Sequence, residues 1–391
     1  MRERRNTDVI ETDILIVGGG IAGCGTAYFL AREGAEVLLI ERDQVNAHAS
    51  GSNSGSLHAQ IPYEPFVEIG PDWAEVFAPS LHLLRASMEL WSRLPGELGE
   101  DLEVSLGGGL IVAETEAQLR EVRRKAALER ASGLEVEELS RTDLERIAPY
   151  LARRMAGGAI CATEGKANPL LATPALYRAA VRHGARFLTG VTLNALAREG
   201  TRFRAETNKG PIRANRIVNA AGAEASDIAA LLGVRVPIEG FPIQTTVTEP
   251  TAPLTKHLLY YAGGRLSLKQ AANGSLLIGG GWAAERDGRT GALRINWQSL
   301  TSNLAIARAV VPAVAGVRFL RAWPAVVNGT ADWKPVLGEL PGVPGFLMTV
   351  FPWLGFSAGP IVARITADIL LGRDPGFDLS PFSAARYLGS S

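Results

Sequence analysis

Alternating apolar and polar positions divide the chain into strands and helices, and the clearest unit lies close to the N-terminus. Residues 14–17 form an unbroken apolar run followed by three glycines, which predicts a buried parallel strand. Helical spacing follows over 22–32 and stops at Gly34, and a second apolar run covers 37–40. This succession predicts a strand, a turn, a helix and a second strand in one compact unit.

The same periodicities recur along the rest of the chain. Apolar residues at helical spacing predict helices over 79–94, 115–131, 174–182, 296–310 and 361–371. Short apolar or alternating runs predict strands within 157–163, 187–189, 192–197, 203–207, 212–219, 237–281, 316–327 and 346–351. The segment 102–113, with glycines at 107–109, predicts a hairpin.

The order of these blocks indicates a discontinuous, two-domain α/β chain. Segment 217–226 repeats the opening pattern, because an apolar strand leads through small residues into a helix that extends to Leu232. The first domain therefore resumes after an insertion. We expect this domain over 1–60, 157–233 and 330–391, and a second domain of antiparallel sheet and helices over 61–156 and 234–329.

Composition excludes several classes of protein. The 391 residues are 47% hydrophobic, enough for two cores, and 40 basic residues cancel 40 acidic ones. No long charged run suggests a nucleic-acid partner. The basic residues at 2–5 have no apolar segment behind them, so they are not a secretory signal, and no apolar run approaches the roughly 18 residues of a membrane span. We expect a cytoplasmic protein, at most peripheral to the inner membrane.

Cys24 and Cys161 are the only cysteines. They form no C-x-x-C motif and have no zinc or iron–sulfur spacing, so no metal site is predicted. Electrons that leave this chain have no cluster of its own to pass through.

The turn after the first strand carries the pattern G-x-G-x-x-G. Gly18 allows the tight turn, Gly20 lets the backbone approach a pyrophosphate, and Gly23 lets the helix pack on the strand. The amides at the start of the helix favour a phosphate. Glu41 ends the second strand, where its carboxylate can accept both ribose hydroxyls of an adenosine. We therefore predict an adenine dinucleotide site, and the motif alone leaves NAD and FAD open.

A loop of small and polar residues follows Glu41. Residues 49–57 are either the start of a helix whose amides, with Ser50, Ser52, Asn53 and Ser54, face a polar ring or phosphate, or a mobile surface loop. His48 and His58 flank this segment. Neither histidine has a neighbouring carboxylate in the sequence that would make it a base.

Four segments together resemble the D-amino-acid oxidase superfamily of FAD-dependent oxidoreductases, over essentially the whole chain. They are the Gly18 turn with Glu41, the loop 49–55, the strand and turn 218–222, and the Gly355-Phe356 turn. The runs SGSNSGSLHAQ and KQAANGSLLIGGGW look closest to the FAD subunits of heteromeric opine and imino-acid dehydrogenases, such as D-hydroxyproline and cyanide-forming glycine dehydrogenases.

The resemblance implies a Rossmann-like FAD-binding domain of the glutathione-reductase type with an inserted substrate domain. FAD would lie extended, with its flavin ring between the loop 50–57 and the turn 352–356, and Val191 would hold the adenine through its backbone. The implied FAD-binding residues are Gly18, Gly20, Ile21, Ala22, Gly23, Glu41, Arg42, Ser50, Gly51, Ser52, Asn53, Ser54, Gly55, Ser56, Leu57, Val191, Ala221, Gly222, Pro352, Trp353, Leu354, Gly355 and Phe356.

Two departures from the family pattern change the picture. Where amino-acid oxidases of this family carry an arginine that binds the substrate carboxylate, the chain has Val327. Either another cation (Lys269 first, then Arg265 or Arg321) takes that role, or the substrate is not a plain amino acid. Second, His48 resembles the site of covalent flavin attachment in dimethylglycine-type dehydrogenases, but the surrounding loop favours non-covalent binding.

The resemblance implies oxidation of a C–N bond of a secondary amine or amino acid (opine, imino acid, D-amino acid or N-methyl amino acid) by hydride transfer to flavin N5. The candidates beside the substrate are His58, Tyr260, Tyr261, Lys269 and Asn328. The chain would be a subunit of a heteromeric dehydrogenase that passes electrons to a partner carrying FMN or iron–sulfur centres, or to a quinone. A stand-alone oxidase that uses oxygen and a catalytically silent flavin-binding assembly subunit remain as alternatives.

Overall fold

The structure, a computed structural model, describes residues 9–388 and divides the chain into two compact units. Unit 1 comprises residues 1–51, 172–240 and 328–391, and unit 2 comprises 52–171 and 241–327. The basic residues at 2–5 lie outside the described residues. Relative to the expected domains, 52–60 and 157–171 belong to unit 2, because β6 (Gly157–Cys161) and the pair β3 (Ser56–Leu57) and β7 (Gly165–Lys166) hydrogen-bond within that unit.

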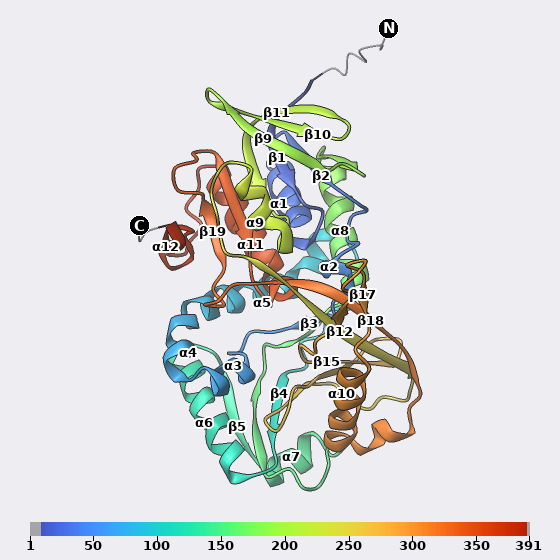
Figure 1. Cartoon of the computed structure of the whole chain (residues 1–391). Coiled ribbons are helices and arrows are strands. Elements are labelled where there is room, and N and C mark those ends of the chain that lie inside the picture. Colours follow the sequence, from blue (N-terminus) through green and yellow to red (C-terminus); the bar gives the residue numbers. More distant parts are fainter. Residues whose placement is uncertain (1–8, 389–391) are drawn as a thin grey trace. The chain divides into compact units, whose positions relative to one another are not determined.

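Unit 1 contains a sheet whose central strands are parallel (Figure 1). Its order is β19 (Val336–Glu339), β20 (Phe346–Val350), β11 (Gly210–Asn219), β1 (Ile10–Val17), β2 (Val37–Glu41) and β8 (Arg186–Thr189). The antiparallel strands β9 (Leu193–Glu199) and β10 (Arg202–Thr207) extend from β11. Because β1 pairs in parallel with β2 and β11, Val17 lies beside Ile40 and Asn219, and all three strands end at the same edge.

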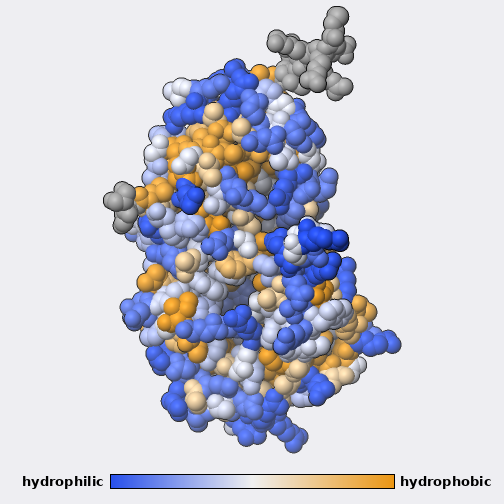
Figure 2. Space-filling view, viewed as in Figure 1, coloured by the Kyte–Doolittle hydropathy of each residue, from blue (hydrophilic) through white to orange (hydrophobic). Residues whose placement is uncertain are grey.

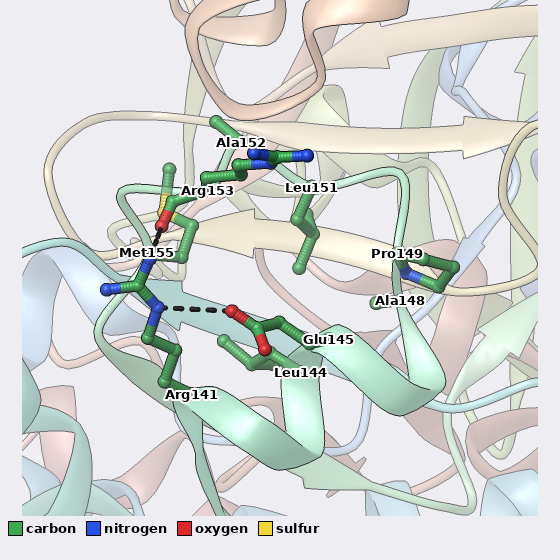
Figure 3. A pocket seen from close by; sticks show the side chains of 9 residues that line it. All are labelled: Arg141, Leu144, Glu145, Ala148, Pro149, Leu151, Ala152, Arg153 and Met155. Atoms are coloured by element: carbon green, nitrogen blue, oxygen red, sulfur yellow. Dashed lines mark hydrogen bonds and ion pairs between the residues drawn. The ribbon is translucent and has the colours of Figure 1, made fainter.

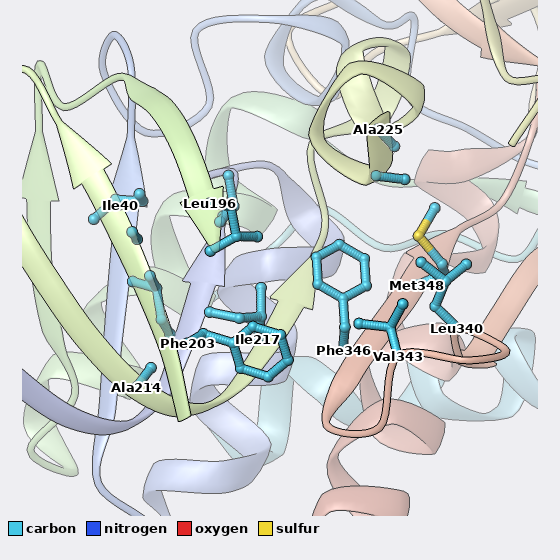
Figure 4. Packing of buried hydrophobic residues seen from close by; sticks show 14 of the residues in the cluster. Ile40, Leu196, Phe203, Ala214, Ile217, Ala225, Leu340, Val343, Phe346 and Met348 are labelled. Atoms are coloured by element: carbon cyan, nitrogen blue, oxygen red, sulfur yellow. The ribbon is translucent and has the colours of Figure 1, made fainter. Parts of the chain in front are cut away.

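The helices of unit 1 pack closely on one another and on the sheet. They include α1 (Ile21–Ala31), α8 (Pro169–Arg182), α9 (Ala225–Ala230) and α11 (Gly355–Leu370), and the short α12 (Ala385–Leu388) also belongs to this unit. A Cβ at Gly25 of α1 would lie 2.8 Å from the Cβ of Ala363, and one at Gly359 would lie 2.6 Å from Ile21. On one side of the sheet, Phe203, Ile217 and Phe346 form the centre of a buried apolar cluster (Figure 4).

Unit 2 contains a mixed sheet of eight strands. Its order is β18 (Phe319–Gly329), β12 (Glu239–Pro250), β15 (Ser275–Gly279), β14 (Ser267–Gln270), β13 (Leu258–Tyr261), β4 (Gly109–Ala113), β6 and β5 (Val136–Ser140). Within the strand-rich segment expected over 237–281, β14 and β15 pair as an antiparallel hairpin. The hairpin expected over 102–113 is wrong, because β4 pairs in parallel with β13 and antiparallel with β6.

The glycines at 107–109 allow close approach rather than a hairpin turn. A Cβ at Gly107 would lie 2.4 Å from the carbonyl oxygen of Lys256, and one at Gly109 would lie 1.7 Å from Oε2 of Glu164. No side chain larger than hydrogen fits at either position.

Helices surround the sheet of unit 2, and several have the caps that their sequences predict. They are α3 (Tyr63–Glu68), α4 (Pro71–Phe77), α5 (Pro79–Leu98), α6 (Glu116–Ala131), α7 (Arg141–Ile147) and α10 (Trp297–Val310). Thr115 with Gln118, and Ser140 with Asp143, form capping boxes. Leu110, Leu259, Leu268 and Ile278 belong to a second buried apolar cluster in this unit.

On the face shown in Figure 2, hydrophobic residues gather over part of unit 1, and hydrophilic residues cover much of the remaining surface. Among the exposed large apolar side chains, Trp297 is 68% and Leu320 is 57% accessible. No helix within residues 9–388 is both long enough and apolar enough to cross a membrane.

Candidate active site

The dinucleotide turn of unit 1 has no space for side chains at its glycines. Gly18 has φ +113°, and a Cβ there would lie 2.5 Å from the carbonyl oxygen of Ala220. A Cβ at Gly20 would lie 2.9 Å from Oγ of Ser50, and one at Gly23 would lie 2.0 Å from the carbonyl oxygen of Gly18. The Ser50 hydroxyl in turn accepts the amide hydrogen of Ile21 at 2.9 Å. Only glycine fits at these three positions, as in a dinucleotide-binding turn.

Glu41 is held at the end of β2 with its carboxylate buried. Its Oε2 accepts the amide hydrogen of Gly19 at 2.6 Å, and its Oε1 accepts that of Asp43 at 2.9 Å. The main-chain oxygen of Glu41 accepts the amide hydrogen of Val191 at 2.9 Å. Arg42, the next residue, forms an exposed ion pair with Glu224 at 2.9 Å. The acid and the backbone of Val191 thus lie together beside the glycine turn.

A second glycine-containing turn precedes α11 in unit 1. The helix begins at Gly355, earlier than the expected start at 361, and Leu354 supplies no side-chain cap. Around a Cβ built on Gly355 there is open space to 4 Å. Trp353 adopts φ +59°, which is unusual for a residue with a side chain. It is fixed there by a 2.8 Å hydrogen bond to the carbonyl oxygen of Asn328 and by stacking on Trp333.

These features of unit 1 fit an FAD molecule. The helices α1 and α11 both follow glycine-containing turns whose N-cap residues supply no side-chain cap, and a buried acid ends the second strand. Oδ1 of Asn328 is buried without a hydrogen-bond donor among the described residues, and Asn328 Nδ2 lies 3.8 Å from a Cβ built on Gly222. A buried acceptor without a donor is what a ligand N–H or O–H would satisfy.

The loop after Ser50 carries a buried lysine site in unit 2. Of the two interpretations left open for 49–57, a short helix start is observed: α2 covers Ala49–Ser52, and the chain then extends into β3. Nζ of Lys269 donates hydrogen bonds to the hydroxyls of Ser54 at 2.7 Å, Ser56 at 2.6 Å and Ser267 at 3.3 Å. Lys269 is 1% exposed, and burial, followed by the charge of Lys166, lowers its pKa to about 7. A buried ammonium with hydroxyl partners is suited to receive an anion.

His58 follows this loop and begins a chain of hydrogen bonds. Its Nδ1 lies 2.6 Å from the hydroxyl of Tyr260, and that hydroxyl donates to Oε2 of Glu164 at 2.8 Å. Burial, followed by the charge of Lys269, lowers the pKa of His58 to about 3. Burial, followed by the charge of Glu164, raises the pKa of Tyr260 well above its usual value. Both rings are therefore neutral near pH 7.

Glu164 is the residue that sequence reasoning missed. It is fully buried and accepts hydrogens from the amides of Ala59 and Gln60 and from the side chain of Gln60. Gln60 also accepts from Lys125, whose ammonium pairs with Glu129 at 2.6 Å. The only signal in the sequence was an acid beside a glycine, in a short loop between two strands.

The other candidates lie in different surroundings. Tyr261 points away from Tyr260, as alternation in β13 requires, and donates to Glu114 at 2.7 Å. Arg265 forms an exposed ion pair with Glu68, and Arg321 lies over the ring of Trp323. Of the three cations considered for a carboxylate, only Lys269 is buried.

Two further features concern the loop and a separate cavity. Nε1 of Trp323 donates to the main-chain oxygen of Ser52 at 2.7 Å, which ties the loop to β18. His48 is exposed and lies 2.7 Å from Asp43. A cavity of about 420 Å³ in unit 2 is lined by residues of α7 and of the segment that follows it (Figure 3). None of its lining residues belongs to the predicted site.

Comparison with known proteins gives one consistent result. The family profile "DAO: FAD dependent oxidoreductase" matches residues 13–369. The beta subunit of sarcosine oxidase from Rhizobium meliloti (strain 1021) is 26% identical, with 96% of this chain and 88% of the relative covered. An opine oxidase subunit from Rhizobium meliloti is 27% identical, with coverages of 96% and 98%.

Solved structures share the fold over the same length. Glycine oxidase from Geobacillus kaustophilus superimposes with a TM-score of 0.84 at 23% identity, covering 97% of this chain and 100% of that one. L-proline dehydrogenase from P. horikoshii gives a TM-score of 0.86 at 22% identity, with coverages of 97% and 99%. With the glycine turn, the buried Glu41 and the second helix start in place, the chain belongs to the DAO family and is an FAD-dependent oxidoreductase.

Proposed function

We propose that this enzyme oxidises a C–N bond of a secondary amine or amino acid, by hydride transfer to N5 of FAD, as one subunit of a heteromeric dehydrogenase. The observation that carries the proposal is the buried Lys269, because its ammonium contacts three serine hydroxyls and no carboxylate among the described residues. The names of the relatives support the amine substrate and the subunit role. Opines, imino acids, D-amino acids and N-methyl amino acids are the candidate substrates.

FAD supplies the electron-accepting ring that takes up a hydride equivalent from the substrate carbon. We propose that the Gly18 turn and Glu41 hold its pyrophosphate and adenosine ribose, and that Val191 contacts the adenine. The loop 50–57 and the turn 352–356 are the proposed contacts of the flavin ring. The start of α11 would stabilise negative charge on the reduced ring.

Val327 occupies the position where amino-acid oxidases of the family carry a carboxylate-binding arginine. We propose that Lys269 binds the substrate carboxylate instead. The pairing of Leu259 with Leu268 places Tyr260 and Ser267 side by side on one face of the sheet, and Lys269 shares that face. The Ser267 contact of Nζ is the longest of the three, so it is the one that a carboxylate oxygen would replace. A bound carboxylate raises the lysine pKa and keeps the ammonium charged.

Amine oxidation of this kind depends on positioning more than on strong acids or bases. We propose that His58 and Tyr260 border the substrate on the same side as Lys269. Consistent with this, His58 contacts Tyr260, which lies beside Ser267 in the sheet, and Ser267 contacts Nζ of Lys269. Asn328 remains a candidate through its unsatisfied Oδ1, whereas Tyr261 is committed to Glu114.

The electron acceptor follows from the subunit role. We propose that reduced FAD passes its electrons to a partner subunit carrying FMN or iron–sulfur centres, or to a quinone, and that the enzyme is cytoplasmic or at most peripheral to the inner membrane. Copurification of smaller subunits with the tagged chain, together with slow reoxidation of the reduced flavin by oxygen, is the expected result. If oxygen rapidly reoxidises the reduced flavin in the isolated chain, the protein is instead a stand-alone oxidase.

The decisive experiment is anaerobic bleaching of the bound flavin by a panel of opines, imino acids, D-amino acids and N-methyl amino acids. Lys269→Met should raise the half-saturating concentration of the best substrate about tenfold or more, because a desolvated charge pair contributes roughly 2 to 5 kcal/mol. The matched control is Arg265→Met, which removes an exposed cation four residues earlier on the chain and should change little.

Both results have a clear alternative. If no compound bleaches the flavin, which dithionite still reduces, the chain is a flavin-binding subunit without this activity. If Lys269→Met and Arg265→Met behave alike with their flavin spectra intact, Lys269 does not bind the carboxylate, and Arg321 and His58 become the next candidates.

A further inference from the structure

We infer that Glu164 is a positioning residue that acts through Tyr260 to hold His58 in one tautomer, with the proton on Nδ1, so that Nε2 accepts a hydrogen bond from the substrate amine. This inference rests on the proposed function and adds to it the way in which the amine end of the substrate is recognised. Lys269 and His58 would then divide the substrate between them, the lysine taking the carboxylate and the histidine the amine.

The direction of the hydrogen bonds follows from the carboxylate at the end of the chain. Oε1 of Glu164 accepts two backbone amide hydrogens, from Ala59 at 2.6 Å and Gln60 at 2.8 Å. Oε2 accepts from Nε2 of Gln60 at 2.8 Å and from the hydroxyl of Tyr260 at 2.8 Å. With four donors directed at its two oxygens, the carboxylate acts only as an acceptor in this chain.

Tyr260 has a single hydroxyl proton, and it uses this proton to donate a hydrogen bond to Oε2 of Glu164. Its oxygen can then only accept from Nδ1 of His58, at 2.6 Å. A neutral imidazole carries one proton, so a proton on Nδ1 leaves Nε2 as the acceptor nitrogen. The tautomer of His58 is thus set by a carboxylate that is 106 positions later in the sequence.

The fold makes specific room for this carboxylate. The carboxylate of Glu164 fits only because residue 109 is glycine. A Cβ atom at position 109 would lie 1.7 Å from Oε2 of Glu164. Glu164 itself is 0% exposed. A buried carboxylate is costly unless it is fully hydrogen-bonded, and this one is.

The proposed contact concerns the neutral form of the amine. A neutral amine keeps the lone pair that hydride loss from the neighbouring carbon requires, and it still has an N–H to donate to Nε2. His58 is too weak a base to remove a proton outright, so we assign it an orienting contact with the substrate.

Glu164→Gln tests the direction of the chain. The glutamine oxygen can keep the two backbone amides, but its NH₂ group replaces the oxygen that accepts from Gln60 and Tyr260. The Tyr260 hydroxyl must then accept from this NH₂ group and donate to Nδ1 of His58. The proton of His58 moves to Nε2, which now faces the amine donor. We expect flavin reduction by the best substrate to slow about tenfold or more at unchanged FAD content, since two donors face each other.

The tautomer is read directly by NMR with ¹⁵N-labelled histidine, in which the protonated and unprotonated ring nitrogens have different shifts. His58→Asn identifies the signals of His58 among the five histidines. The matched control is Glu114→Gln, which alters the same kind of tyrosine–glutamate contact at Tyr261, the neighbouring residue. It should leave both the tautomer and the reduction rate as in the wild type.

Three outcomes decide the inference. A wild-type His58 protonated on Nδ1 that becomes protonated on Nε2 in Glu164→Gln supports it, and a tautomer that does not respond overturns it. If Glu164→Gln does not fold, Tyr260→Phe replaces it, and a single unchanged tautomer in that variant overturns the inference. If no amine reduces the wild-type flavin, the proposed function fails, but the tautomer measurement still tests the chain of hydrogen bonds.

Discussion

Removing one partner of the buried ion pair on α6 should destabilise the protein more than any surface charge change. Lys125 and Glu129 are one helical turn apart, their side chains are 3% and 1% exposed, and Nζ lies 2.6 Å from Oε1. Oε1 also accepts the amide hydrogen of Ile61, whereas Oε2 has no donor among the described residues. Lys125→Met would therefore leave Glu129 buried with one backbone donor.

Two routes give the size of the effect. Breaking a buried ion pair by removing one partner costs about 3 to 5 kcal/mol. Alternatively, Glu129 takes up a proton in the folded variant. Starting from its ordinary pKa of 4.5, that proton costs about 1.4 kcal/mol per pH unit, or roughly 4 kcal/mol at pH 7.5. Because burial already raises the pKa of Glu129 in the wild type, the second value is an upper limit, and we expect a loss of about 3 to 4 kcal/mol at pH 7.5.

The pH dependence has a definite sign. Burial raises the pKa of Glu129 in the folded protein, so above pH 4.5 the folded state holds a proton that the unfolded state has lost. Stability therefore falls as pH rises, and more steeply in Lys125→Met. The difference between the variant and the wild type should therefore be smaller at pH 5.5 than at pH 7.5.

Urea unfolding of the FAD-saturated protein at both pH values measures this difference. Two controls accompany it. Arg141→Met breaks an exposed pair with Glu145 of the same helical spacing and should cost less than about 1 kcal/mol. Adding Glu129→Gln to Lys125→Met should recover most of the loss, because no charge then remains buried. A Lys125→Met variant as stable as Arg141→Met, or a loss independent of pH, would refute the reasoning.

Four further outcomes follow from the site. Glu41→Lys should weaken FAD binding by roughly 2 to 3 kcal/mol, or about 30- to 150-fold in Kd, and unchanged flavin occupancy would remove Glu41 from the site. Acid precipitation should release the flavin into solution, whereas flavin retained in the pellet would point to covalent attachment at His48. Binding of a carboxylate inhibitor should weaken as pH rises above about 7, where Lys269 loses its proton, and a flat profile would contradict its role. Cys24 and Cys161 should resist a thiol reagent in the native protein and react after denaturation, because burial raises the pKa of both thiols, that of Cys161 to about 12.

The sequence predicted those parts of the fold that depend on local spacing. The first strand, the glycine turn and helix α1 were expected within a few residues of their observed bounds, because the turn chemistry and the apolar period lie within one short segment. Strand parity also predicted that Leu266 and Leu268 face opposite to Ser267 and Lys269, and both leucines do lie in the apolar cluster of unit 2.

Long-range contacts were not predictable from the same patterns. The glycines at 107–109 read as a hairpin turn, but their role depends on Lys256 and Glu164, which are distant in the sequence. Glu164 read as an ordinary loop acid for the same reason. Lys269 lies in an alternating strand whose polar face could point to solvent or to a buried group of hydroxyls. Periodicity could not distinguish these two environments, because a polar side chain is found in both.

The contact between α1 and α11 has a consequence for how cofactor affinity responds to mutation. Gly25 lies against Ala363, and Gly359 lies against Ile21, with no room for one more carbon atom at either glycine. Both helices begin at a proposed FAD contact. The distance between the helices therefore sets the distance between the two N-termini that would bind the same FAD molecule. A methyl group added inside this helix pair would push the two ends apart. Residues that touch no ligand would then appear in a genetic screen as defects in flavin retention.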